Sequence, residues 1–196
     1  MATRKQDKQE KSGGGMDATQ LLKQDHDEVR KMFEEFESAD EDRKFELAAE
    51  ICHALTVHAT IEEEIFYPQV RAAIDAEDLM LEAEIEHDGV KQLIERIQEG
   101  EVDETQLSAM VNVLKEYVNH HVNEEQRKMF PRAKRAELDL AAIGRELQQR
   151  KTELEGEIAT ATIDDSDESD AASDDEDDSG TDRSRGGMAA RDDDEE

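Results

Sequence analysis

The sequence contains few of the residues that cross-link a chain or interrupt its helices. It has one cysteine, Cys52, only two prolines, and 4% aromatic residues among its 196. A single cysteine excludes an internal disulfide and fits a reducing compartment, so we expect a cytoplasmic location. No apolar run is long enough to cross a membrane, and the first residues lack the apolar stretch of a secretory signal. Scarce proline, with abundant Ala, Glu, Leu and Arg, favours an all-α fold.

Positive charge is also scarce. The chain has 24 Lys and Arg residues against 54 Asp and Glu residues, a formal net charge of -30. Such negative charge repels phosphate backbones and anionic lipid, so we expect neither nucleic acid nor a membrane as a partner. Residues 161–196 alone hold three basic and sixteen acidic groups. This acidic tail is a candidate contact for a protein partner, and a solvated appendage is the alternative.

Composition divides the chain into four segments. Residues 1–15 are polar and end in Ser-Gly-Gly-Gly, which is typical of a flexible leader. Residues 16–135 carry a periodic apolar pattern and form the predicted bundle. Residues 136–159 look helical but are more charged, so they either extend the bundle or form a fifth helix packed on it. Residues 160–196 have too little apolar surface to offset the entropy of ordering, which predicts a disordered acidic tail.

Apolar residues recur at steps of three and four in four stretches between residues 16 and 135. This spacing is typical of helices with one buried face. We expect Pro68 to kink or end the second helix, Gly100 to stop the third, and Pro131 to end the fourth. The four stripes are Leu22, His26, Val29, Phe33 and Phe36; Ile51, Leu55, His58, Glu62 and Ile65; Met80, Ala83, His87, Val90, Ile94 and Ile97; and Leu107, Met110, Leu114, Tyr117, His121 and Glu125.

One sequence pattern occurs twice. Histidine, three residues, glutamate, four residues, an aromatic residue and proline occupy residues 58–68 and again residues 121–131. A further histidine stands upstream of each copy, at His26 and at His87. Each half is long enough for two helices and a turn. The repeat therefore predicts a four-helix bundle, a fold that builds metal sites from inward side chains on facing helices.

The inward stripes place four histidines and two glutamates at one level of this bundle. Burying two unpaired carboxylates costs roughly several kcal/mol each, and no Lys or Arg lies on the stripes to compensate them. A metal centre supplies the missing positive charge, with neutral imidazoles completing its ligand shell. Two further histidines, His53 and His120, fall off the stripes. The predicted ligands are His26, His58, Glu62, His87, His121 and Glu125.

The two carboxylates, which the repeat relates to each other, can each bridge two cations, with one histidine pair completing each cation. This arrangement predicts a dinuclear centre. Nitrogen and carboxylate ligands in a helical bundle suit iron, and zinc and manganese are the alternatives. Few protein ligands for two metals leave open positions at which dioxygen, nitric oxide or peroxide can bind.

These residues resemble the hemerythrin-like HHE cation-binding domain over residues 16–135. The resemblance implies an up-down-up-down four-helix bundle with a non-haem di-iron centre, in which the four histidines are terminal ligands and the two glutamates bridge. Oxygen-carrying members use a fifth histidine one turn before His87, where this sequence has Ala83. That departure argues against simple reversible oxygen carriage. Glu84 is a candidate replacement for the missing ligand.

The neighbours of the predicted ligands have less direct predicted roles. Tyr67 and Phe130 are predicted to cover one end of the core, and Asp27 and Asp88 are candidates to orient the imidazoles. Cys52 is expected to be a small buried apolar residue. The acidic neighbours of the ligands are expected at the surface: Glu63, Glu64 and Glu124.

The predicted function is that of a non-haem di-iron protein that binds or senses dioxygen, nitric oxide, or the redox or iron state. The alternative is a di-iron enzyme acting on peroxide or ferrous iron, similar to a catalase, a peroxidase or a ferroxidase. No separate nucleophile triad or phosphate loop is found, which favours a metal- and gas-binding module over a dedicated enzyme. A third reading gives the metal a structural role alone. The oligomeric state is left open.

Overall fold

The computed structural model describes residues 15–100 and 102–167, with side chains up to residue 157. The chain divides into two compact units, Met1–Ile158 and Ala159–Glu196. Regular structure in the described ranges is entirely helical, as predicted. Residues 1–14 of the predicted leader and residues 168–196 of the predicted tail lie outside the described ranges.

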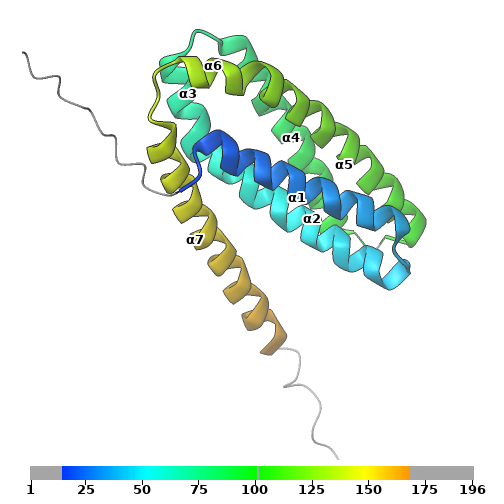
Figure 1. Cartoon of the computed structure of the whole chain (residues 1–196). Helices are drawn as coiled ribbons and strands as arrows, with labels where there is room; N and C mark the ends of the chain where they lie inside the picture. The colour runs from blue at the N-terminus through cyan, green and yellow to red at the C-terminus, as the bar shows by residue number, and fades with distance from the viewer. Residues whose placement is uncertain (1–14, 101, 168–196) are drawn as a thin grey trace, which may run out of the picture. The chain divides into compact units, whose positions relative to one another are not determined.

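Four long helices of the first unit lie side by side (Figure 1). Three of them begin after an aspartate, namely Asp17, Asp40 and Asp103, whose side chain accepts a hydrogen bond from a backbone N–H three residues later. Such caps satisfy N–H groups that the first helical turn leaves without partners. The four helices are α1 (Ala18–Ser38), α2 (Glu41–Ile61), α4 (Glu77–Glu99) and α5 (Glu104–Glu124).

Helices α2 and α5 each continue through a π-helical turn into a shorter helix. The N–H of Tyr67 bonds the carbonyl of Glu62, five residues earlier, in the turn immediately before Pro68. The same bond forms before Pro131, where the N–H of Phe130 bonds the carbonyl of Glu125. The wider turn accommodates a residue that has no N–H, so the helix continues through each proline. This excludes an end at Pro68, one of the two predicted alternatives there, and the predicted end at Pro131. The added elements are η1 (Glu62–Phe66), α3 (Tyr67–Ala73), η2 (Glu125–Met129) and α6 (Phe130–Arg135).

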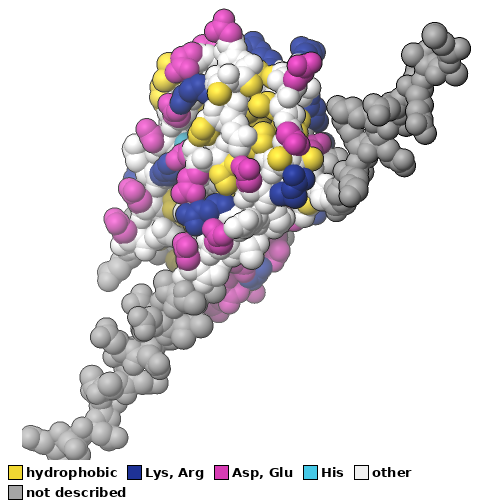
Figure 2. All heavy atoms as spheres, turned by 90° about the vertical axis from the view of Figure 1, so that its left-hand side faces the viewer, with side chains coloured by type: hydrophobic (Ala, Val, Ile, Leu, Met, Phe, Trp, Pro, Cys, Tyr) yellow, Lys and Arg dark blue, Asp and Glu magenta, His cyan; other side chains and the backbone are white. Residues whose placement is uncertain are grey.

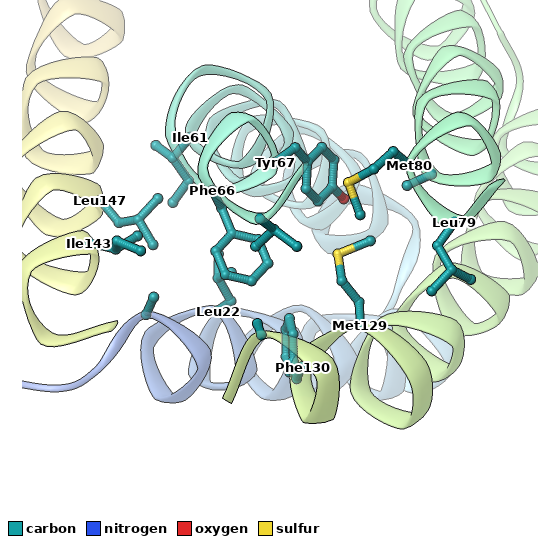
Figure 3. Close-up of a cluster of buried hydrophobic side chains, with 14 of the residues drawn as sticks. Leu22, Ile61, Phe66, Tyr67, Leu79, Met80, Met129, Phe130, Ile143 and Leu147 are labelled. Carbon is teal, nitrogen blue, oxygen red and sulfur yellow. The ribbon is translucent and has the colours of Figure 1, made fainter. Parts of the chain in front are cut away.

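Buried apolar side chains form two clusters, one on each side of the predicted site. The first includes Leu22, Ala83 and the residues labelled in Figure 3, and the second includes Val29 and Val90. His26 follows Leu22 and precedes Val29 along α1, and His87 lies likewise between Ala83 and Val90. Each of these helices therefore passes from one apolar cluster to the other through the level of the histidines.

Most residues of the predicted apolar stripes are buried, but Ile65 and Met110 are only partly buried. Tyr117 of the fourth stripe is 48% exposed, and Val118 takes the inward position instead. The helical period allows both residues, because each lies three or four positions from Leu114 and from His121, so packing selects Val118. Cys52 is fully buried, as predicted.

A further helix, α7 (Leu140–Asp167), follows the repeat. Its Ile143 and Leu147 are 2% and 0% exposed and belong to the first apolar cluster, where Figure 3 shows them near Ile61 and Phe66. The sequence predicts that residues 136–159 either extend the bundle or form a further helix packed on it. The structure shows the second of these arrangements. Helical backbone also continues to Asp167, beyond residue 160, at which the predicted tail begins.

The surface of the first unit mixes charges of both signs. On the face in Figure 2, acidic and basic side chains are interspersed with apolar ones. Arg43, for example, contacts Glu35, Glu46 and Glu50. Exposed ion pairs of this kind contribute little to stability, so the two apolar clusters are its main source.

Gly144 provides a test of how closely α7 packs. A Cβ at Gly144 would overlap the backbone oxygen of Met16 and lie 2.9 Å from the backbone nitrogen of Ala18. Gly144→Ala should therefore lower the free energy of unfolding by about 1–3 kcal/mol, which outweighs the roughly 1 kcal/mol that alanine gains over glycine in a helix. Urea unfolding measures the change.

Gly156→Ala is the matched control, since it lies in the same helix and its added Cβ would meet nothing within 4 Å. It should leave stability unchanged or raise it by up to about 1 kcal/mol. Equal stabilities of the two variants would contradict the close approach of α7 to the start of α1.

Candidate metal centre

All six predicted site residues meet in the interior of the first unit. Each is at most 6% exposed, although all are polar or charged. Their ligand atoms form two overlapping groups, each within a span of 4.8 Å, and Glu62 belongs to both groups. The residues come from α1 (His26), α2 (His58), η1 (Glu62), α4 (His87), α5 (His121) and η2 (Glu125).

The histidines form two pairs. The Nε2 atoms of His26 and His58 are 2.9 Å apart, and those of His87 and His121 are 3.1 Å apart. In each pair two imidazoles thus present the same nitrogen to each other. Imidazole nitrogens are common metal ligands, and a cation held between such nitrogens removes the repulsion between two lone pairs.

Each glutamate lies between the two pairs. Oε2 of Glu62 is 3.3 Å from Nε2 of His58 and 3.5 Å from Nε2 of His87. Oε2 of Glu125 is likewise 3.3 Å from Nε2 of His26 and 3.7 Å from that of His121. Each carboxylate therefore contacts one histidine of each pair, which is the placement that a bridging ligand needs.

Two buried carboxylate oxygens at this centre have no hydrogen-bond partner. They are Oε1 of Glu62 and Oε2 of Glu125. A buried carboxylate without a partner is costly, and a cation is the partner that nitrogen and oxygen donors of this kind accept. The donor set therefore fits a metal.

Burial and neighbouring charges shift the pKa values of the Glu62 and Glu125 carboxyl groups in opposite directions. Burial raises the pKa of Glu62 well above its usual range, and the charge of Glu125 adds to this effect. Burial opposes the charge of Glu125 as well, but the facing imidazoles of His121 and His26 outweigh it and lower the pKa of that carboxyl.

Tyr67 contributes a hydroxyl to the middle of the site. It donates toward Oε1 of Glu125 at 3.1 Å and toward Oε2 of Glu62 at 3.3 Å, and it lies 3.3 Å from Nε2 of His87. Burial, with the two carboxylates, raises the pKa of Tyr67 well above its usual range. Tyr67 therefore keeps its proton at the centre. Its counterpart Phe130 instead stacks parallel to His26, with ring centroids 6.1 Å apart.

The π turn explains how Tyr67 reaches Glu62. Residues five apart in an α-helix point about 140° away from each other. The i to i−5 bond of η1 widens the turn and brings Tyr67 back over Glu62. The sequence pattern showed the aromatic residue and the proline but not this change of helical register.

The outward nitrogens of the histidines have partners that the sequence reasoning missed. Nδ1 of His87 is 2.8 Å from Glu63, and Nδ1 of His121 is 2.9 Å from Glu86. Nδ1 of His58 lies 3.5 Å from Asp25. A carboxylate that accepts from Nδ1–H fixes the tautomer in which Nε2 carries the lone pair, as a metal ligand requires.

Several predicted roles are not seen. Asp27 binds Arg30 at the surface at 2.7 Å instead of an imidazole. Asp88 is exposed, and Glu63, expected at the surface, is the acidic neighbour that contacts His87. Glu84 binds Arg71 at 2.7 Å, away from the six site residues.

An apolar cavity of about 20 Å³ adjoins the four imidazoles. Apart from Asp25 and the histidines, its lining is aliphatic, with Val29, Leu55 and Val90 among the lining residues. A cavity needs roughly 10–15 Å³ to hold one water molecule, so this one has room for about one small molecule.

The fold and the site together define a class of protein, a helical bundle that holds cations between buried histidines and glutamates. The sequence model of the hemerythrin HHE cation binding domain matches residues 17–133. The chain belongs to this family. Helix α7 lies outside the matched region. In the part of the chain that the structure describes, no helix is both long and apolar enough to cross a membrane.

Two known proteins show how far the similarity extends. A crystal structure of a hemerythrin HHE cation binding domain-containing protein from Mycobacterium kansasii superposes with a TM-score of 0.63 at 21% identity, over 72% of this chain and 89% of that one. A DNA nickase from Nostoc sp. is 29% identical over 139 residues, which are 70% of this chain. The chain spans only 36% of the length of that nickase.

Tyr67→Phe tests the central hydroxyl. The substitution removes the hydrogen bonds to both buried carboxylates, so the free energy of unfolding of the metal-free protein should fall by about 1–3 kcal/mol. Tyr117→Phe, at the half-exposed tyrosine of α5, should change it by less than about 0.5 kcal/mol. Urea unfolding of both variants makes the comparison, and an equal response would remove Tyr67 from the centre.

Proposed function

We propose that this protein carries a dinuclear non-haem iron centre, within an up-down-up-down four-helix bundle, and binds or senses dioxygen, nitric oxide or the redox or iron state. The proposed ligands are the six converging residues, with Glu62 and Glu125 as bridges. When bound, the iron pair would supply open coordination positions and electrons. The site residues fit iron because they offer both imidazole nitrogen and carboxylate oxygen.

The apolar cavity beside the imidazoles carries this proposal. At about 20 Å³ it excludes larger organic substrates, and its aliphatic lining favours an uncharged ligand such as dioxygen or nitric oxide. Small cavities of this polarity stay free of water unless polar groups hold it. The site thus combines a cation position with a space suited to a diatomic gas.

Turnover of peroxide or ferrous iron is the second candidate function. Tyr67 places a proton-bearing hydroxyl at the centre, and Ala83, where oxygen-carrying relatives have a histidine, is small and buried. Both features would suit an open metal position with a nearby proton. We propose no nucleic-acid or membrane partner, because the chain carries a net charge of -30.

Iron content tests the ligand set. The full chain, purified anaerobically with ample iron, should hold about two irons, and Glu62→Ala should hold about one or fewer because both positions lose a bridging oxygen. Glu64→Ala is the matched control, since Glu64 pairs with Arg150 at the surface, and it should keep about two irons. Mass spectrometry of the metal content gives the number of irons per chain in each protein. Full occupancy in Glu62→Ala would remove Glu62 from the ligands, and a metal-free, folded wild-type protein would overturn the proposed function.

Gas binding tests whether the apolar cavity holds the ligand. Mixing the iron-loaded protein with dioxygen or nitric oxide should give a reversible change in its visible spectrum. Val90→Ile adds a methylene to the cavity lining and should weaken this response about tenfold, by the roughly 1–3 kcal/mol that overpacking costs.

Val113→Ile is the control for this substitution, because Val113 is exposed on α5 and does not line the cavity. It should leave both iron content and gas response unchanged. Catalytic loss of added peroxide would favour the enzyme instead, and the absence of any response to gas or peroxide would leave the metal a structural role.

A further inference from the structure

The partners of the outward histidine nitrogens follow the internal repeat. The residue before the first histidine of each half contacts the second histidine of that half, as Asp25 does at His58 and Glu86 at His121. The residue after each bridging glutamate contacts the first histidine of the other half. Glu63 plays this part at His87.

The repeat is broken at one of these four positions. Gln126, which follows Glu125, stands where Glu63 stands in the first half, and its amide nitrogen Nε2 lies 3.1 Å from Nδ1 of His26. This nitrogen is a donor, and the amide oxygen accepts from Nδ1–H only when the amide group is turned over. In either orientation the amide carries no charge. One histidine pair therefore has two anionic partners and the other has one.

The distances show the same asymmetry. At the His87–His121 pair the carboxylates approach Nδ1 to 2.8 and 2.9 Å. At the His26–His58 pair the amide is at 3.1 Å and the single carboxylate, that of Asp25, is at 3.5 Å. A contact of 3.5 Å is at the outer limit of a hydrogen bond.

Neighbouring lysine side chains increase the difference in negative charge between the two histidine pairs. Lys151 of α7 binds Asp25 at 2.7 Å and is 20% exposed, so it offsets the one anion of the His26–His58 pair. At the other pair Lys91 binds Glu63 at 2.6 Å, whereas Glu86, besides His121, contacts His120 at 3.3 Å and has no Lys or Arg partner among the described residues. One uncompensated negative charge thus remains next to the His87–His121 pair.

A carboxylate that accepts from the far nitrogen of a histidine raises the basicity of the metal-binding nitrogen, and losing it typically costs about 10–100-fold in metal affinity. We propose that the two cation positions are unequal: the His87–His121 position binds the tighter cation, and Gln126 makes the His26–His58 position the weaker and more readily exchanged one. This inference rests on the proposed function, because it assumes that both pairs hold a cation.

Stepwise titration of the full-length, metal-free protein with ferrous iron under anaerobic conditions tests the inference. Calorimetry of the wild type should show two separate binding steps. Gln126→Glu should tighten the weaker step about tenfold and leave the tighter one in place, so that the two affinities converge. Glu63→Gln should weaken the tighter step about tenfold. Mössbauer spectra of half-loaded protein made with enriched iron should show one iron environment in the wild type and two in Gln126→Glu.

Gln92→Glu, on the exposed side of α4, is the control for added negative charge and should move neither step. The inference is overturned if both cations bind with one affinity in the wild type, or if Gln126→Glu tightens the step that is already tighter. If no iron binds to a wild-type protein that is folded by circular dichroism, the proposed function itself fails, and this outcome is distinct from two equal steps.

Discussion

The enclosure of two carboxylates and four imidazoles between two apolar clusters is the constraint on which the rest of the structure depends. The six side chains are at most 6% exposed, and two of their oxygens have no hydrogen-bond donor. Such a group of polar atoms is stable only when its charges are balanced. Tyr67 and the carboxylates at the outward nitrogens supply hydrogen bonds to this group. A cation, after which the family of the chain is named, would supply the missing positive charge.

The position of each ligand reflects the helical period together with one departure from it. The four-residue step of the repeat aligns His58 with Glu62 and His121 with Glu125. The π turns then widen both helices at the glutamates, which carries Tyr67 inward and lets each helix continue through its proline. The same local change therefore places a proton donor at the centre and allows α3 and α6 to follow the prolines.

The all-helical fold and the convergence of the six residues could be predicted because both are encoded at short range. A histidine and a glutamate four residues apart share a helix face in any helical fold, and the repeat doubles the signal. The outward partners could not be predicted in the same way. Asp25 and His58 are 33 residues apart on different helices, and with 54 acidic residues in the chain, no local feature distinguishes Asp25, Glu63 or Glu86 from the others. Tyr117 was misplaced because a step of three or four residues from Leu114 fits the pattern equally well, and packing selects Val118.

Helix α7 changes what counts as the functional module. The inherited family domain ends at residue 133, yet Ile143 and Leu147 complete its apolar interior and Lys151 reaches an aspartate that contacts a site histidine. The boundary of the family match and the physical boundary of the module thus fall at different places along the chain. A fragment excised at the end of the family domain would expose part of its own core and lose a countercharge, so α7 is an integral component of the folded module.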